Sequence, residues 1–328
     1  MTVASKEKAV KDGAHISFGS FGRIRKSMSR LKISAISYLN TAPLMWDFEH
    51  TEVGADFDIS YTIPSACAEA LRAGTADVGI IPAAAYASIP DLIIIPDIAI
   101  AARRAVRSIL LVSKLPTVSM SKEEWATTIR TVALDTSSMT SVALAKIIFA
   151  KWLGGAREYK AMAPDLEAML GACHAALLIG DPALQVDRSR YFTLDLAEEW
   201  VSRSGKSFVF AFWAIRKAAL DGRDGREIRE VFKRSRDHGL SSSNLEVIAQ
   251  EWALRLGLTV ESVRLYLTQN IHYYLDPPCL DGLDLYYHLG AEIGALLSAP
   301  ELCFIDGRIL GASSKTPAMP ISSQVGEN

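Results

Sequence analysis

The sequence lacks the features that mark several large classes of protein. Its four cysteines lie far apart and form no CxxC pair, which disfavours a zinc site or a disulfide framework and favours buried, reduced thiols. No run of about 18 apolar residues occurs, and the longest apolar stretches have the length of strands. No hydrophobic segment follows the basic N-terminus, so a secretory signal is not expected. The net charge of −2 gives no overall positive field for a nucleic-acid backbone.

Common catalytic and cofactor motifs are also missing. The sequence contains no GxGxxG, HExxH or GxSxG motif and no EF-hand loop, and its six histidines show no metal-ligand spacing. We therefore predict neither a metal nor a cofactor. Of 328 residues, 49% are hydrophobic and 22% are charged, which indicates a globular protein. We expect it to be cytoplasmic, a monomer or homodimer, with no nucleic-acid or membrane partner.

Apolar runs and helical periods alternate along most of the chain. Strands are predicted at 31–37, 59–62, 77–81, 92–95, 108–113, 131–134, 175–179 and 207–215. Helices are predicted from Ser65 as N-cap to Gly74 as stop, at 83–88, at 142–152, from Asp181 as N-cap, and through 225–297. This alternation favours an α/β fold with mixed, mostly parallel sheets.

The order of these elements predicts two lobes joined by two crossings of the chain. Residues 31–110 and 210–311 are expected to form the first lobe, which includes the C-terminal helices, and residues 111–209 form the second. Residues 1–30 are predicted to be a disordered extension, and 312–328 a disordered tail. Two hinged lobes place a ligand cleft between them, walled by strand ends and helix starts.

Polar turns follow several of the predicted strands. They comprise Tyr38 to Thr41 after the first strand, Ser65 at a helix start, Ser108 at the first crossing, and Ser138, Thr140 and Ser141 at another helix start. Hydroxyl groups and the unpaired N–H groups of a helix start bind carboxylates or phosphates. Each of these turns by itself is explained as ordinary helix capping. If several of them lie in one cleft, they would favour a small anionic ligand there.

An ordered set of segments resembles chorismate dehydratase, an enzyme family of the futalosine route to menaquinone. The set begins with YLNTAPL at 38–44 and continues at 64–65, 71–74, 77–82, 86, 132–135, 140–141, 175–184 (AALLIGDPAL), 208–211, 237–240 and 266–267. It covers roughly residues 31–290. The resemblance implies a two-lobed type II periplasmic-binding-protein fold, chorismate as the substrate, and 3-[(1-carboxyvinyl)oxy]benzoate and water as the products.

The resemblance also implies roles for particular residues. Asn40 and Ser108 match the active-site asparagine and serine of the family, and Thr140 and Ser141 match a polar loop that holds a carboxylate. Further substrate contacts are expected from Tyr38, Thr41, Ser65, Ser138, Asp181 and Phe210. Met139 is a departure, because many relatives have arginine there. Arg103, Arg104 or Arg107 would be candidates to compensate, although a solvated charged face is the simpler account of these arginines.

Loss of the C3 proton and the C4 hydroxyl makes the chorismate ring aromatic, so the protein has to orient a dianion and exclude water. Asn40 cannot act as a base near neutral pH and is assigned hydrogen bonding. The candidates for the base are the enolpyruvyl carboxylate of the substrate itself and the side chains of Asp135 and Asp181, although helix capping is the simpler role for these two aspartates. Two other functions also stay open: a solute-binding protein for a small carboxylate, and 1,4-dihydroxy-6-naphthoate synthase, whose SPCPND-type opening is replaced here by SYLNTAPL.

Overall fold

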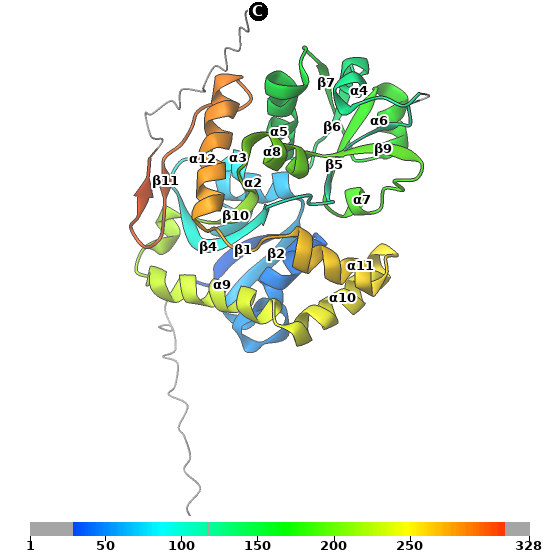
Figure 1. Ribbon diagram of the computed structural model, residues 1–328. Helices are drawn as coiled ribbons and strands as arrows, with labels where there is room; N and C mark the ends of the chain where they lie inside the picture. Colours follow the sequence, from blue (N-terminus) through cyan, green and yellow to red (C-terminus); the bar gives the residue numbers. More distant parts are fainter. Residues whose placement is uncertain (1–28, 117, 312–328) are drawn as a thin grey trace, which may run out of the picture. The chain divides into compact units, whose positions relative to one another are not determined.

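A computed structural model describes residues 29–116 and 118–311, which contain two five-stranded sheets covered by helices (Figure 1). The first sheet has the order β2-β1-β3-β10-β4 and consists of β1 (Leu31–Ile36), β2 (Phe57–Thr62), β3 (Val78–Pro82), β4 (Leu92–Ala102) and β10 (Phe208–Arg216). The second has the order β7-β6-β8-β5-β9 and consists of β5 (Ile109–Lys114), β6 (Thr131–Asp135), β7 (Glu158–Met162), β8 (Ala175–Ile179) and β9 (Tyr191–Asp195).

Both sheets follow one plan. Four strands of each sheet run in the same direction, and the fifth runs antiparallel between two of them. The antiparallel strand is β10 in the first sheet and β5 in the second, and each is the strand that enters directly from the other sheet. The predicted mixed α/β fold is therefore confirmed. Parallel and antiparallel neighbours are equally frequent, because the inserted strand opposes both strands beside it.

Helices occupy most of the chain between the strands. They are α1 (Trp46–His50), α2 (Pro64–Arg72), α3 (Ala83–Tyr86), α4 (Lys122–Thr128), α5 (Thr140–Ile148), α6 (Leu166–Ala172), α7 (Gly180–Leu184), α8 (Leu196–Ser204), α9 (Gly225–Gly239), α10 (Ser242–Leu256), α11 (Val260–Leu265) and α12 (Pro277–Glu292). Shorter turns are the 3-10 helices η1 (Leu39–Met45), η2 (Glu52–Asp56) and η4 (Lys217–Leu220) and the π-helical turns η3 (Phe149–Leu153) and η5 (Tyr266–Asn270). A small hairpin joins β11 (Leu302–Cys303) and β12 (Ile309–Leu310). Within the described ranges, no helix has the length and apolar character needed to cross a membrane.

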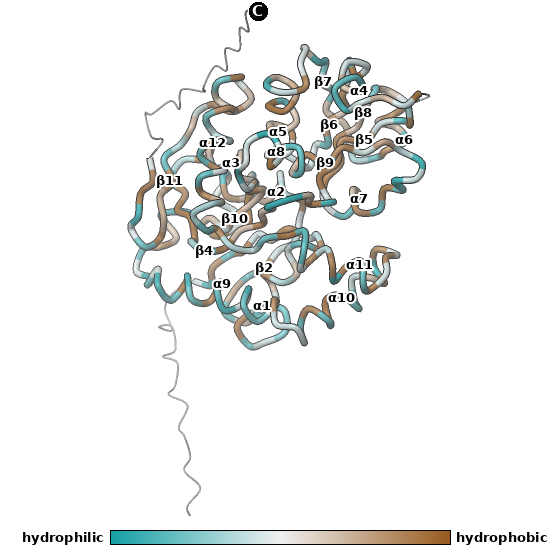
Figure 2. Tube along the Cα trace, viewed as in Figure 1, coloured by the Kyte–Doolittle hydropathy of each residue, from teal (hydrophilic) through white to brown (hydrophobic). Residues whose placement is uncertain are grey.

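Strands that are buried on both faces form the core. Every residue of β8 is buried, and so is every residue of β10 except the last. Figure 2 shows these inner strands as brown, hydrophobic tracks, whereas much of the outer helices is teal. Continuous apolar runs of this kind are expected where helices cover both faces of a sheet. The segments 1–28 and 312–328, on which the predicted extension and tail fall, lie outside the described residues.

Two predicted helix caps are wrong. Helix α2 starts at Pro64, so Ser65 is its second residue, because proline is already suited to the first helical position. Helix α7 starts at Gly180, so Asp181 lies inside it rather than before it. The carboxylate of Asp181 instead accepts the backbone N–H of Leu39 at 3.0 Å. This hydrogen bond joins η1, which follows β1 of the first sheet, to α7, which follows β8 of the second sheet.

The helical region predicted for 225–297 is interrupted between η5 and α12. Residues 271–276 are extended there and pair with the end of β4, where His272 and Ala101 exchange two backbone hydrogen bonds of 2.8 and 2.9 Å. The Asn270 side chain also donates to the carbonyl of Ala105 at 2.9 Å. These contacts hold the chain after α11 against residues 103–108, the first crossing between the sheets.

Candidate functional site

One pocket is lined by most of the residues that the sequence predicts for the site. Its polar lining consists of Tyr38, Asn40, Ser108, Ser138, Thr140 and Ser141, and Phe210 is also in its wall. The pocket has an empty volume of about 470 Å³, part of which is open to solvent. Seven of the ten predicted residues therefore converge, although they come from widely separated parts of the chain.

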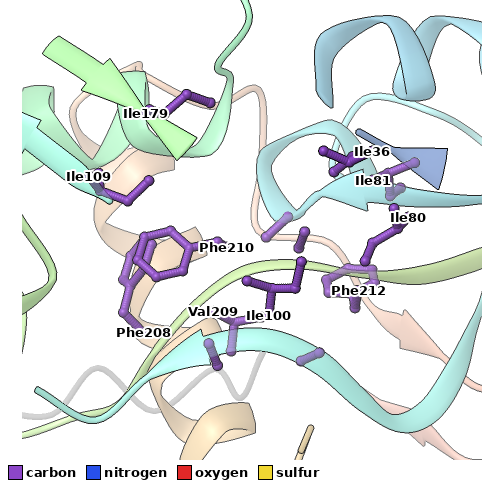
Figure 3. Close-up of a cluster of buried hydrophobic side chains, with 14 of the residues drawn as sticks. Ile36, Ile80, Ile81, Ile100, Ile109, Ile179, Phe208, Val209, Phe210 and Phe212 are labelled. Atoms are coloured by element: carbon purple, nitrogen blue, oxygen red, sulfur yellow. The ribbon is translucent and has the colours of Figure 1, made fainter. Parts of the chain in front are cut away.

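The remaining walls of the pocket are mainly apolar and come from both sheets. Ile36 and Ile100 belong to the first sheet, Ile109 and Ile179 belong to the second, and Phe210 lies on the inserted strand β10 (Figure 3). Ligand sites commonly combine apolar walls with a few placed polar groups. This pocket therefore suits a small ligand with an apolar body and oxygen substituents.

The start of α5 supplies part of the polar lining. The backbone N–H of Ser141 donates to Oγ of Ser138 at 3.3 Å, which leaves the Ser138 hydroxyl proton available for another acceptor. Thr140 differs, because its hydroxyl donates to the Phe210 carbonyl at 3.0 Å and accepts the Ala84 N–H at 3.1 Å. The Thr140 side chain thus fixes the helix start against α3 and β10, and Ser138 and Ser141 are left to present hydroxyl groups to a ligand.

Asn40 and Ser108 meet at a tyrosine that the sequence analysis did not assign to the site. The Tyr266 hydroxyl donates to Oγ of Ser108 at 2.8 Å, and the nearby Asn40 side chain acts on the pKa of the same hydroxyl. Burial raises the pKa of Tyr266 above its ordinary value of 10, so the hydroxyl keeps its proton at neutral pH. The only sequence signal for this residue was its place in the matched segment 266–267.

Tyr38 and Gly180 face each other at the edge of the pocket. The Tyr38 hydroxyl lies 3.4 Å from Oγ of Ser137, and burial raises the pKa of Tyr38 above 10, so this group is a donor rather than a base. Gly180 has φ +61°, and a Cβ there would come within 2.5 Å of the Tyr38 ring. Glycine is therefore required both by the backbone conformation and by the close approach of the ring.

Three predicted residues lie behind the pocket instead of lining it. The Thr41 hydroxyl donates to Oδ1 of Asn40 at 3.4 Å, and the backbone N–H of Ser65 donates to a carbonyl just before α5 at 3.1 Å. Asp181 accepts the Leu39 N–H, and burial raises the pKa of its carboxyl group to about 6. These residues connect the segments that form the site, and none of the three lines the pocket.

The pocket lining contains no lysine, arginine, histidine or carboxylate among the described residues. Arg103 forms an ion pair with Asp276, and neither Arg104 nor Arg107 lines the pocket, so none of the three brings a positive charge to the pocket in this structure. The Asp135 carboxylate is buried and accepts two hydrogen bonds from the nearby Ser137. Carboxylates in the pocket would therefore be held by neutral donors.

A possible cation site lies outside the pocket and fits a cation poorly. His272, Asp276 and Cys279 bring ligand atoms within 4.8 Å of one another. The Asp276 carboxylate is already paired with Arg103, accepts the backbone N–H of Cys279 as the N-cap of α12, and lies 2.8 Å from Nε2 of His272. Burial raises the pKa of the Cys279 thiol to about 12, so the thiolate that a metal needs is disfavoured.

Each sheet contains one antiparallel strand that comes from the other sheet, and residues of both sheets line one pocket. This arrangement is that of the periplasmic-binding-protein fold. Protein AF1704 from Archaeoglobus fulgidus superimposes with a TM-score of 0.62 at 16% identity, covering 81% of this chain and 98% of that one. The periplasmic aliphatic sulphonate-binding protein SsuA from Escherichia coli gives 0.57 at 16% identity, covering 85% and 97%. These similarities confirm the predicted fold class.

Sequence comparison then gives the family. A profile of the menaquinone biosynthesis family matches residues 31–292, so the chain belongs to that family. Among its relatives is the chorismate dehydratase of Thermus thermophilus, which is 27% identical over 267 residues, or 76% of this chain and 91% of the relative. The resemblance that began with YLNTAPL at 38–44 is thereby confirmed.

Proposed function

We propose that this protein is a chorismate dehydratase, a hydro-lyase that converts chorismate to 3-[(1-carboxyvinyl)oxy]benzoate and water. The observation that carries the proposal is the convergence of Asn40, Ser108 and the α5 start on one pocket with apolar walls. Membership of the menaquinone biosynthesis family and the name of the Thermus relative support it. We place the reaction in the cytoplasm, and the free thiols of all four cysteines agree with a reducing compartment.

The geometry supports a specific arrangement of the substrate. Branched aliphatic side chains from both sheets would contact the ring, and the hydroxyl groups of Ser138 and Ser141 would bind a carboxylate together with the start of α5. Asn40 and Ser108 would bind the C4 hydroxyl or the second carboxylate. Neutral donors hold an anion without supplying a strong acid that could favour side reactions.

The elimination breaks the C3–H and C4–O bonds, forms the C3–C4 double bond and releases water. We assign the proton transfer to the enolpyruvyl carboxylate of the substrate itself, because no group able to act as a base near neutral pH lines the pocket in the described part of the chain. Asp181 does not line the pocket, and its carboxylate accepts a hydrogen bond from the Leu39 N–H. The Tyr38 hydroxyl keeps its proton, because burial raises its pKa. The protein's part is to orient the dianion and exclude water.

The test is to mix the purified protein with chorismate and follow the products by liquid chromatography and mass spectrometry. We expect 3-[(1-carboxyvinyl)oxy]benzoate from the wild type, and a loss of about a hundredfold or more in Asn40→Ala or Ser108→Ala, because each substitution removes a donor from the reacting oxygen. Gln250→Ala removes an exposed amide on the outer face of α10, is the matched control, and is expected to retain full turnover.

Each remaining outcome has a definite meaning. Near-wild-type rates in Asn40→Ala and Ser108→Ala would refute the assignment of the site. If the protein binds chorismate but leaves it unchanged, the result would favour the solute-binding function. If it does not bind chorismate, the result would favour 1,4-dihydroxy-6-naphthoate synthase or another protein of the same fold. A pH–rate profile with an essential protein group near pH 6–7 would refute the substrate-assisted proton transfer.

A further inference from the structure

Tyr266 stands directly behind the polar wall of the pocket. It is the first residue of η5, its side chain is 2% exposed, and it does not line the pocket. Its hydroxyl nevertheless donates to Oγ of Ser108 at 2.8 Å, and the Asn40 side chain is near enough to act on the pKa of this hydroxyl. A substitution at Tyr266 can therefore reach the site through these two residues without removing a direct contact to a ligand.

The direction of these hydrogen bonds follows from what each group can donate. The Thr41 hydroxyl donates to Oδ1 of Asn40 at 3.4 Å, so the NH₂ group is the part of the Asn40 amide that is left to donate to other groups. Tyr266, which stays protonated, donates its proton to Oγ of Ser108. Since Ser108 accepts a hydrogen bond from behind, its own hydroxyl proton is free to point into the pocket.

We propose that Tyr266 is a positioning residue that makes Ser108 a hydrogen-bond donor toward the bound substrate. The inference rests on the proposed function and deepens it, because it specifies that the ligand places an acceptor oxygen at Ser108. A hydroxyl that already accepts one hydrogen bond donates the next one more strongly. Without the Tyr266 hydroxyl, the Ser108 proton can rotate away from the pocket.

The first test is a double-mutant cycle, because Tyr266→Phe removes only the hydroxyl. We expect kcat/KM for chorismate to fall about tenfold in Tyr266→Phe, but by less than about twofold when Ser108 is already alanine. Tyr273→Phe is the matched control. Tyr273 is also 2% exposed, and its hydroxyl has no partner in the described part of the chain, so its removal should leave turnover unchanged. Equal losses from Tyr266→Phe in both backgrounds would overturn the inference.

A second test does not depend on turnover or on the folding of Tyr266→Phe. In protein labelled with ¹³C at the tyrosine ζ carbon, we expect Ser108→Ala to shift the Tyr266 resonance and to leave that of Tyr273 in place. An unmoved Tyr266 resonance would overturn the inference even if chorismate is dehydrated normally. A shifted resonance in a protein whose wild type leaves chorismate unchanged would support the hydrogen-bonded arrangement and overturn the proposed function instead.

Discussion

Asp181→Asn is expected to stabilise the protein at neutral pH and to have little effect in acid. Burial raises the pKa of the Asp181 carboxyl from 3.8 to about 6, and the Leu39 N–H only partly offsets that cost. A difference of about 2 between the pKa in the folded and in the unfolded protein corresponds to about 3 kcal/mol in the free energy of unfolding. Since solvent reaches part of this side chain, we expect a gain of about 1–3 kcal/mol at pH 7.

The sign of the pH dependence follows from proton binding. Between pH 4 and 6, as a rough window, the native Asp181 holds a proton that the unfolded chain has released, so wild-type stability falls as the pH rises through this range. The asparagine variant has no such titration but retains an oxygen that accepts the Leu39 N–H. The difference between the two proteins should therefore grow from pH 4 to pH 6 and then stay constant.

Urea unfolding of both proteins at several pH values from about 4 to 8 measures this difference. Asp187→Asn is the control, because the pKa of that exposed carboxyl is lowered by its hydrogen bonds with Ser189, and its difference from wild type should be flat above about pH 4.5. A flat difference for Asp181→Asn as well would refute the reasoning. Turnover should persist in Asp181→Asn, and its abolition would identify Asp181 as the base.

Two further substitutions test how the site is built. Thr140→Val removes two buried hydrogen bonds and should lower the free energy of unfolding by about 2–3 kcal/mol in urea titrations, and a loss below about 0.5 kcal/mol would show that the hydroxyl is not needed there. Gly239→Ala places a Cβ on the Pro43 carbonyl oxygen and should lower the thermal midpoint by several degrees or more. Gly171→Ala, where a Cβ meets nothing within 4 Å inside α6, should raise the midpoint slightly, and equal effects of the two glycine substitutions would contradict the close approach at α9.

Elements with a strong local signal were predictable from the sequence. The apolar run at 175–179 is strand β8 with the same bounds, and Gly74, predicted as a helix stop, has φ +72° and follows Ala73, the C-cap of α2. The helix starts were less predictable. Ser65 and Asp181 both have side chains that suit an N-cap, but α2 begins with proline at its first helical position and α7 begins at glycine, so each helix starts two residues earlier than predicted.

The sequence by itself determined the alternation of strands and helices, the two crossings and the segments that mark the family, because periodicity, turn residues and motif order are local properties of the chain. Only the tertiary structure decided what the polar residues do. In the fold, the Thr140 hydroxyl forms hydrogen bonds with two protein groups, and the Asp181 carboxylate accepts one from η1. The Tyr266 hydroxyl donates to Ser108, which is 158 positions away in the sequence. A hydroxyl or carboxylate is available to a ligand only when no other group in the fold has taken its hydrogen bonds, and that depends on contacts between segments far apart in the chain.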